Sequence, residues 1–216
     1  MDLDPRSLRV YVLTSGDLSG RSHEDVAEAA LEGGATAVQL RAPELADEDL
    51  LPVALRIGAA CRRAGVVFVV NNSLDVVRAC AADGVHVGRD TDVDDARRRV
   101  GSGRVLGVSV RDAAEGRAAE AAGADYLGVT VWPSATKPEA SARGLEGLLE
   151  VVAAVEVPVV GIGGIGPANA GEVLAAGAAG VAVISAVAAA QEPVEAVRVL
   201  RRTVDAVLAI EEARRG

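Results

Sequence analysis

Residues able to bind an anion stand together at the end of one short β-branched run. Residues 36–41 end in Val-Gln-Leu-Arg, and alternation along a strand places Gln39 and Arg41 on the same face. An arginine at the carboxyl end of a strand is a poor core residue but a good ligand for an anionic group. Either Arg41 binds such a group, or it forms a salt bridge at the rim with Glu44 or Asp47.

Polar side chains end two other predicted strands in the same way. Residues 66–72 end in the amide pair Asn71 and Asn72, and residues 105–110 carry Ser109 near their end. Amides at this position either contact a ligand or close a turn through side-chain hydrogen bonds. These residues join Gln39 and Arg41 as polar side chains at the carboxyl ends of predicted strands. Taken alone, the two asparagines are explained equally well by a turn.

Two consecutive segments near the C-terminal end are typical of a phosphate site. A β-branched run ends in Gly163 and Gly164, where the backbone can turn tightly and expose its N–H groups. The next run, residues 180–184, ends in Ile184 and is followed by the hydroxyl residue Ser185. Strand–loop–helix units of this kind bind phosphate in eight-stranded parallel barrels. The alternative is that the glycines only make tight strand-to-helix turns.

A single lysine stands out because the chain otherwise uses arginine for positive charge. Of the 22 lysine and arginine residues, only Lys137 is a lysine. Lysine supplies a compact point charge on a flexible stem, whereas arginine supplies a planar fork. Lys137 lies in residues 132–143, an irregular stretch of a length that is usually functional or disordered. It is therefore a candidate cation of the site, unless it is a chance surface lysine.

His86 and a group of aspartates each leave two explanations open. His86 lies in an apolar run, residues 84–88, where a hydrogen-bonded structural histidine is the simpler interpretation and a catalytic one the alternative. Asp90 and three further aspartates follow this run. They supply either a carboxylate for a metal ion or negative charge for the N-terminus of the next helix. The three further residues are Asp92, Asp94 and Asp95.

Composition argues against several classes of function. The net charge of −9 is unsuited to nucleic acid, which needs a basic surface. No apolar run is long enough to span a bilayer, and the first residues do not resemble a signal peptide. Cys61 and Cys80 stand singly in predicted helices, so we interpret them as packing residues of a cytoplasmic protein.

Strand-like and helix-like segments alternate eight times, which predicts a single-domain (β/α)8 barrel over residues 1–216. Parallel strands in a barrel bring their C-terminal ends to one mouth, and the polar residues above fall at or just beyond those ends. We therefore expect them to form one site. The first predicted strand covers residues 8–14. The predicted helices include one capped by Ser22 and Asp25, residues 47–64, 113–122, 145–154 and 167–176, and an eighth helix at 194–213.

These motifs together resemble the thiamine-phosphate synthase family over essentially the whole chain. The resemblance rests on the order and spacing of several short motifs, since each one alone is weak. They are Gln39-x-Arg41, Asn71-Asn72, Gly-Val-His-Val-Gly at 84–88, Gly-Val-Ser at 107–109, Pro-Ser-Ala-Thr-Lys at 133–137, Gly-Ile-Gly-Gly-Ile at 161–165 and Val-Ile-Ser-Ala at 183–186.

The resemblance implies that a pyrimidine methyl diphosphate and a thiazole phosphate combine into thiamine phosphate with release of pyrophosphate. Catalysis would depend on Arg41, Lys137 and Ser109. The resemblance assigns two sets of binding residues and a magnesium ion held near Asn72 and Asp90. The pyrimidine diphosphate would contact Gln39, Arg41, Asn71, Ser109 and Lys137, and the thiazole phosphate would contact Ser134, Thr136, Gly163, Gly164, Ile184 and Ser185. Partners are thus small phosphorylated substrates, and a homo-oligomer is compatible with the sequence.

The sequence departs from the family pattern where cations are expected. Pro43 stands where the family usually has a lysine, and Asn72 stands where it has a magnesium-binding aspartate. A neutral amide is a poorer ligand for a hard cation than a carboxylate. The second metal aspartate of the family aligns with Thr91, between Asp90 and Asp92. The resemblance therefore implies Mg²⁺ with a weakened set of ligands.

Two alternative functions follow from the same comparison. A thiazole tautomerase shares the fold and lacks the metal aspartates, but it uses a histidine where this chain has Arg111. A catalytically silent barrel that binds thiamine phosphate or its precursors would also explain the altered metal positions. The diphosphate ligands Arg41 and Lys137 favour the synthase over both alternatives.

Overall fold

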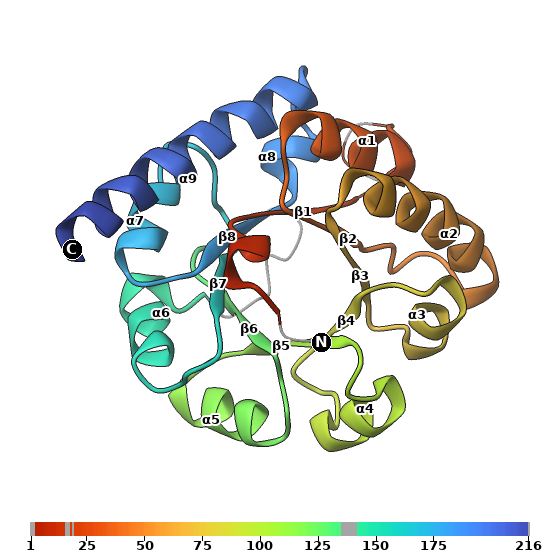
Figure 1. The fold of residues 1–216 in the computed structure, drawn as a ribbon, viewed down its shortest axis with the longest axis horizontal. Coiled ribbons are helices and arrows are strands. Elements are labelled where there is room, and N and C mark those ends of the chain that lie inside the picture. Colours follow the sequence, from red (N-terminus) through yellow and green to blue (C-terminus); the bar gives the residue numbers. More distant parts are fainter. Residues whose placement is uncertain (1–2, 16–17, 19, 135–141, 216) are drawn as a thin grey trace.

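The computed structural model of the protein describes residues 3–15, 18, 20–134 and 142–215. Within them, eight parallel strands pair in chain order and close into a barrel, with helices arranged around the outside (Figure 1). The closing pair joins the first strand to the last, with Val10 opposite Val181 and Val12 opposite Val183. This architecture confirms the predicted (β/α)8 barrel.

Each strand lies within the run of β-branched residues that predicted it, apart from small shifts at the ends. Valine, isoleucine and leucine dominate because both faces of these strands are covered, one by the barrel interior and the other by helices. The strands are β1 (Val10–Leu13), β2 (Ala37–Leu40), β3 (Val67–Asn71), β4 (Gly84–Val87), β5 (Val105–Val110), β6 (Tyr126–Thr130), β7 (Val159–Ile162) and β8 (Gly180–Val183).

Helices follow the strands and cover the barrel (Figure 1). The capping box predicted at the first helix is present, because Ser22 and Asp25 each accept a hydrogen bond from the backbone of the other. The helices are α1 (His23–Gly33), α2 (Asp47–Ala64), α3 (Leu74–Cys80), α4 (Val93–Val100), α5 (Ala113–Ala121), α6 (Gly144–Val152), α7 (Ala170–Ala175), α8 (Ser185–Ala188) and α9 (Pro193–Arg215).

The structure differs from the sequence prediction at three points: the start of the first strand, the start of α7 and the number of helices after β8. A 3-10 helix, η1 (Pro5–Leu8), takes Leu8 out of the predicted first strand, since Asp4 caps it and Pro5 suits its first turn. Helix α7 begins at Ala170 and not at residue 167, because Asn169 holds the preceding turn through Gly166 and Gly164. Residues 194–213 belong to α9 and are not the eighth helix, since the short α8 precedes them.

The apolar core has two layers on either side of the strands. A smaller cluster fills the barrel interior, and a larger one lies between the strands and the helices. Cys61 and Cys80 are buried in the outer layer, where burial raises the pKa of the Cys61 thiol to about 12. Both cysteines thus act as packing residues, as predicted from their isolated positions.

No helix in the described part of the chain is long and apolar enough to cross a membrane.

Two glycines make room for large rings inside the barrel. A Cβ atom on Gly107 of β5 would collide with the ring of Tyr126 on β6. A Cβ atom on Gly128 of β6 would lie 3.2 Å from Cε1 of His86 on β4. The barrel interior therefore accepts these two rings because a glycine, with no side chain, stands at each point of contact, on the adjacent strand for Tyr126 and two strands away for His86.

Substituting Gly107→Ala should destabilise the fold, because the added methyl group must displace the Tyr126 ring from a closely packed interior. We expect a loss of about 1–3 kcal/mol in the free energy of unfolding, measured by denaturant titration. Gly103→Ala is the matched control, since no heavy atom lies within 4 Å of a Cβ built there. Equal losses in the two variants would contradict this explanation.

Candidate active site

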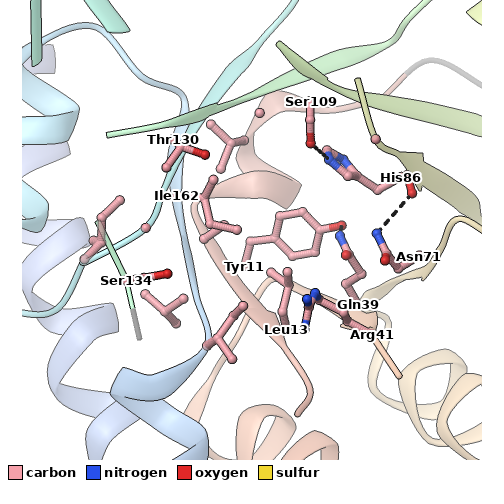
Figure 2. A pocket seen from close by; sticks show the side chains of 18 of the residues that line it. Tyr11, Leu13, Gln39, Arg41, Asn71, His86, Ser109, Thr130, Ser134 and Ile162 are labelled. Carbon is pink, nitrogen blue, oxygen red and sulfur yellow. Dashed lines mark hydrogen bonds between the residues drawn. The ribbon is translucent and has the colours of Figure 1, made fainter. Parts of the chain in front are cut away.

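A pocket opens at the C-terminal ends of the strands and brings together most of the predicted site residues. Figure 2 shows Ser134 and Thr130 on one side of the pocket, across from Asn71, Gln39 and Arg41. Asp90 does not line the pocket, and Thr136 and Lys137 lie outside the described residues. The predicted residues that line it are Gln39, Arg41, Asn71, Asn72, Ser109, Ser134, Gly163, Gly164, Ile184 and Ser185.

The floor of the pocket is a chain of hydrogen-bonded side chains. Nε2 of Gln39 donates to the hydroxyl of Tyr11 at 2.6 Å, and the hydroxyls of Tyr11 and Tyr126 lie 2.9 Å apart. His86 continues the chain, with Nδ1 3.0 Å from the Tyr126 hydroxyl and Nε2 2.9 Å from Oγ of Ser109. Burial raises the pKa of both tyrosine hydroxyls, so they remain protonated.

Hydrogen bonding at both ring nitrogens agrees with the interpretation of His86 as a structural histidine. The two tyrosines were not predicted as site residues. Tyr11 and Tyr126 are far apart in the sequence, and neither stands in a recognisable motif. Only the closure of the barrel brings them into contact, so no local sequence signal could have identified them.

Gln39 is almost fully buried, with 2% of its surface exposed. Its Nε2 is bonded to Tyr11, whereas its Oε1 has no hydrogen-bond partner among the described residues. A buried carbonyl without a partner costs free energy, which a ligand donor at the pocket floor would recover. The amide therefore presents an acceptor to whatever binds here.

Arg41 lies just beyond the end of β2, on the same face as Gln39, as alternation predicted. No ion pair or hydrogen bond of its guanidinium is found among the described residues, but its positive charge is one of the influences that lower the pKa of Glu44. The alternative of a rim interaction with Glu44 is therefore present as a charge interaction without a direct contact. The direct partner of Glu44 is His23, and Oε1 of Glu44 is 2.8 Å from Nε2 of His23. Arg41 is thus available to an anionic ligand.

The backbone of Arg41 is held by the first loop of the barrel. Its N–H donates to Oγ1 of Thr14 at 3.2 Å, and Nδ1 of His23 lies 2.9 Å from the same oxygen. His23 also contacts Glu44, which follows Arg41 in the chain. Thr14 and His23 therefore join the β1–α1 and β2–α2 loops and set the position from which the Arg41 side chain projects.

The amide pair after β3 has a structural function as well as a place in the pocket. Nδ2 of Asn71 donates to the carbonyl of His86 at 3.2 Å, and Oδ1 of Asn72 accepts from the N–H of Gly88 at 3.1 Å. Asn72 has a positive φ of 62°, which asparagine tolerates better than most residues. The predicted turn is therefore present, and both amides also line the pocket.

The aspartates after β4 mostly serve helix α4. Asp92 caps the helix by accepting from the backbone N–H of Asp95, and Asp94 and Asp95 lie in its first turn. Asp90 is exposed and lies outside the lining of the pocket. No cluster of three or more His, Cys, Asp or Glu side chains suited to a metal occurs in the part of the chain that the structure describes.

The glycine pair after β7 turns the chain toward the loop that follows β6. Gly163 and Gly164 have positive φ angles of 89° and 63°, a conformation that favours glycine. A Cβ atom on Gly163 would lie 2.6 Å from the carbonyl oxygen of Trp132. A Cβ atom on Gly164 would lie 2.9 Å from the Cβ atom of Trp132. The pair is needed for the turn and for close approach, and it also borders the pocket.

The electrostatics of the pocket favour an anionic ligand. Among the residues that the structure describes, Arg41 is the only arginine or lysine that lines it, and no carboxylate does. Hydroxyls and amides provide further polar contacts, at Ser109, Ser134 and Asn71. The arrangement can therefore stabilise negative charge and orient a ring, but it offers no carboxylate as a general base.

The fold and the pocket define a (β/α)8 barrel with an anion-binding mouth at the carboxyl ends of its strands. A family model described as thiamine monophosphate synthase matches residues 10–187. The chain belongs to this family.

Relatives with curated names span nearly the same length. The chain is 48% identical over 200 residues to a thiamine-phosphate synthase of Chloroflexus aurantiacus, covering 91% of this chain and 92% of the relative. It is 46% identical over 199 residues to one of Moorella thermoacetica, covering 90% and 95%. A solved thiamine phosphate pyrophosphorylase from Pyrococcus furiosus superposes with a TM-score of 0.88 at 37% identity, covering 94% of this chain and 98% of that one.

Replacing Thr14→Val should weaken the binding of anions at Arg41, because it removes the oxygen that accepts the Arg41 N–H. We expect about a three- to tenfold loss of affinity for inorganic pyrophosphate, measured by calorimetry, as for one lost hydrogen bond. Thr14→Ser keeps the oxygen and is the matched control. Equal weakening in both variants would mean that the methyl group, and not the hydroxyl, positions the loop.

Proposed function

We propose that this chain is a thiamine-phosphate synthase. It joins 4-amino-2-methyl-5-(diphosphooxymethyl)pyrimidine to thiazole phosphate, giving thiamine phosphate and pyrophosphate. The proposal rests on membership of the family together with one observation. Both sets of residues that the sequence predicted, apart from those outside the described chain, line a single pocket.

The composition of the pocket suits a reaction in which the diphosphate leaves first and the thiazole nitrogen then attacks the pyrimidine methylene carbon. Such a reaction needs little proton transfer from the enzyme, which agrees with the absence of a carboxylate from the described lining. Arg41 would stabilise the charge that develops on the leaving diphosphate. The remaining polar groups would hold the two rings in reach of each other.

We divide the binding roles between two groups of lining residues. Gln39, Arg41, Asn71 and Ser109 would hold the pyrimidine diphosphate, together with Lys137, which lies outside the described residues. A second group, from the segments that follow β6, β7 and β8, would hold the thiazole phosphate. It comprises Ser134, Gly163, Gly164, Ile184 and Ser185, with Thr136 outside the described residues.

Magnesium remains a prediction, and the residues described near the pocket do not form a protein-built site for it. Asn72 offers an amide oxygen that already accepts the Gly88 N–H, and Asp90 lies outside the lining. Mg²⁺ prefers carboxylates and commonly shares its coordination with substrate phosphates. A dependence on Mg²⁺ would therefore be weak in this protein.

Substituting Asn72→Asp should strengthen that dependence if this position faces the metal. Aspartate keeps the shape and the oxygen that binds the Gly88 N–H, and it adds the charge that Mg²⁺ prefers. We expect the half-saturating Mg²⁺ concentration for turnover to fall about tenfold, as for 1–2 kcal/mol from a charge-assisted contact. An unchanged Mg²⁺ titration would exclude position 72 as a ligand.

The thiazole tautomerase alternative is weaker than the synthase. Arg111 stands where that enzyme has its histidine, and its side chain forms ion pairs with Asp112 and Glu115. It does not line the pocket. A base at this position is therefore missing.

The decisive test is to mix both substrates with Mg²⁺ and to measure thiamine phosphate. Formation of thiamine phosphate would support the synthase and exclude a silent binding protein. Isomerisation of a thiazole carboxylate phosphate without condensation would support the tautomerase. Tight binding of either substrate with no product would support the silent binder.

A further inference from the structure

The hydrogen-bonded chain at the pocket floor links side chains from five strands. It runs from Gln39 on β2 through Tyr11 on β1, Tyr126 on β6 and His86 on β4 to Ser109 on β5. All five residues line the pocket, and Gln39 and Ser109 form the two ends of the hydrogen-bonded chain. The three middle residues have no part in the proposed binding roles.

The first hydrogen bond fixes the direction of all the others. The Tyr11 oxygen accepts from Gln39, and Tyr11 is 2% exposed, so its own proton has Tyr126 as its hydrogen-bonded acceptor. The Tyr126 proton is then donated to Nδ1 of His86. A neutral imidazole that accepts at Nδ1 carries its proton on Nε2, and this N–H donates to Oγ of Ser109.

The opposite direction leaves a buried donor without an acceptor. If Ser109 donated to His86 and Nδ1–H donated to Tyr126, then Tyr126 would donate to Tyr11. The Tyr11 oxygen would then accept two hydrogen bonds, and its own proton would have no partner among the described residues. Buried donors without partners are strongly disfavoured, so the first direction is preferred.

We propose that Tyr11, Tyr126 and His86 are positioning residues that hold His86 as the Nε2–H tautomer. The Ser109 hydroxyl accepts from His86 and is thereby obliged to donate its proton toward the ligand, while Gln39 offers its unpartnered Oε1 as an acceptor. The floor thus presents one donor and one acceptor to the ligand. An aminopyrimidine matches this pair with its amino group and a ring nitrogen, an identification that rests on the proposed function.

The tautomer can be measured without any substrate. The chain has only two histidines, so the nitrogen spectrum of ¹⁵N-labelled protein contains two imidazoles, and His23→Gln identifies which one is His86. We expect a protonated Nε2 and an unprotonated Nδ1 for His86 in the wild-type protein. A protonated Nδ1 would overturn the proposal. It would require the Gln39 amide to be flipped and every hydrogen bond from Gln39 to Ser109 to be donated in the opposite direction.

Tyr126→Phe tests the consequence for binding. The ring and its packing against Gly107 are retained, but the donor to His86 is lost, so the tautomer is no longer specified. We expect a mixture of tautomers and about a tenfold rise in KM for the pyrimidine diphosphate, with the KM for thiazole phosphate unchanged. Thr203→Val is the control, since it removes a hydroxyl bonded to Val199 within the outer helix α9.

The two measurements separate failure of this inference from failure of the proposed function. A wild-type protein that makes no thiamine phosphate would overturn the proposed function. The nitrogen spectrum would still test the direction in which the hydrogen bonds from Gln39 to Ser109 are donated. A tautomer that is unchanged in Tyr126→Phe would overturn the inference. So would a tautomer that changes with no change in KM, or an equal rise in KM for both substrates, which indicates a general structural role.

Discussion

Room inside the barrel is the constraint on which the site depends. Two large rings and their hydrogen bonds fit at the floor because glycine stands at the points of contact, Gly107 against Tyr126 and Gly128 against His86. Protein interiors are closely packed, so rings held in this way cannot shift without strain. The polar groups at the mouth consequently stand on a rigid base, whose hydrogen bonds are nearly all satisfied within the barrel.

An acidic protein can present an anion site only if its carboxylates are kept away from the pocket. Here an acidic side chain that follows β2 and another that follows β5 are paired with other groups and do not line the pocket. Glu44 contacts His23, and Glu115 pairs with Arg89 and Arg111. The described lining of the pocket then contains the Arg41 guanidinium and no carboxylate, and Glu44, whose pKa Arg41 helps to lower, lies outside that lining. The local charge of the mouth therefore has the opposite sign to the net charge of −9, and local charge is what a phosphorylated ligand meets.

The barrel and much of the mouth were predictable because both follow from local patterns. Short β-branched runs mark the strands, and the polar residues at their ends meet once the strands are parallel. Short elements such as α8 were missed, since four residues carry no periodicity. The Tyr11–Tyr126 contact and the His23–Glu44 pair were missed for another reason. Each joins residues that are distant in the chain, through side-chain orientations that only the folded barrel determines.

Closure of the barrel has a consequence for the way the chain is made. β1 emerges first during synthesis but pairs with β8, the last strand, so one of its edges stays without a partner until nearly the whole chain exists. Pairing over so large a sequence separation carries a high loop-closure entropy and slows folding. Until then the open edge is available to other chains. The nascent protein therefore passes through a stage in which aggregation competes with ring closure.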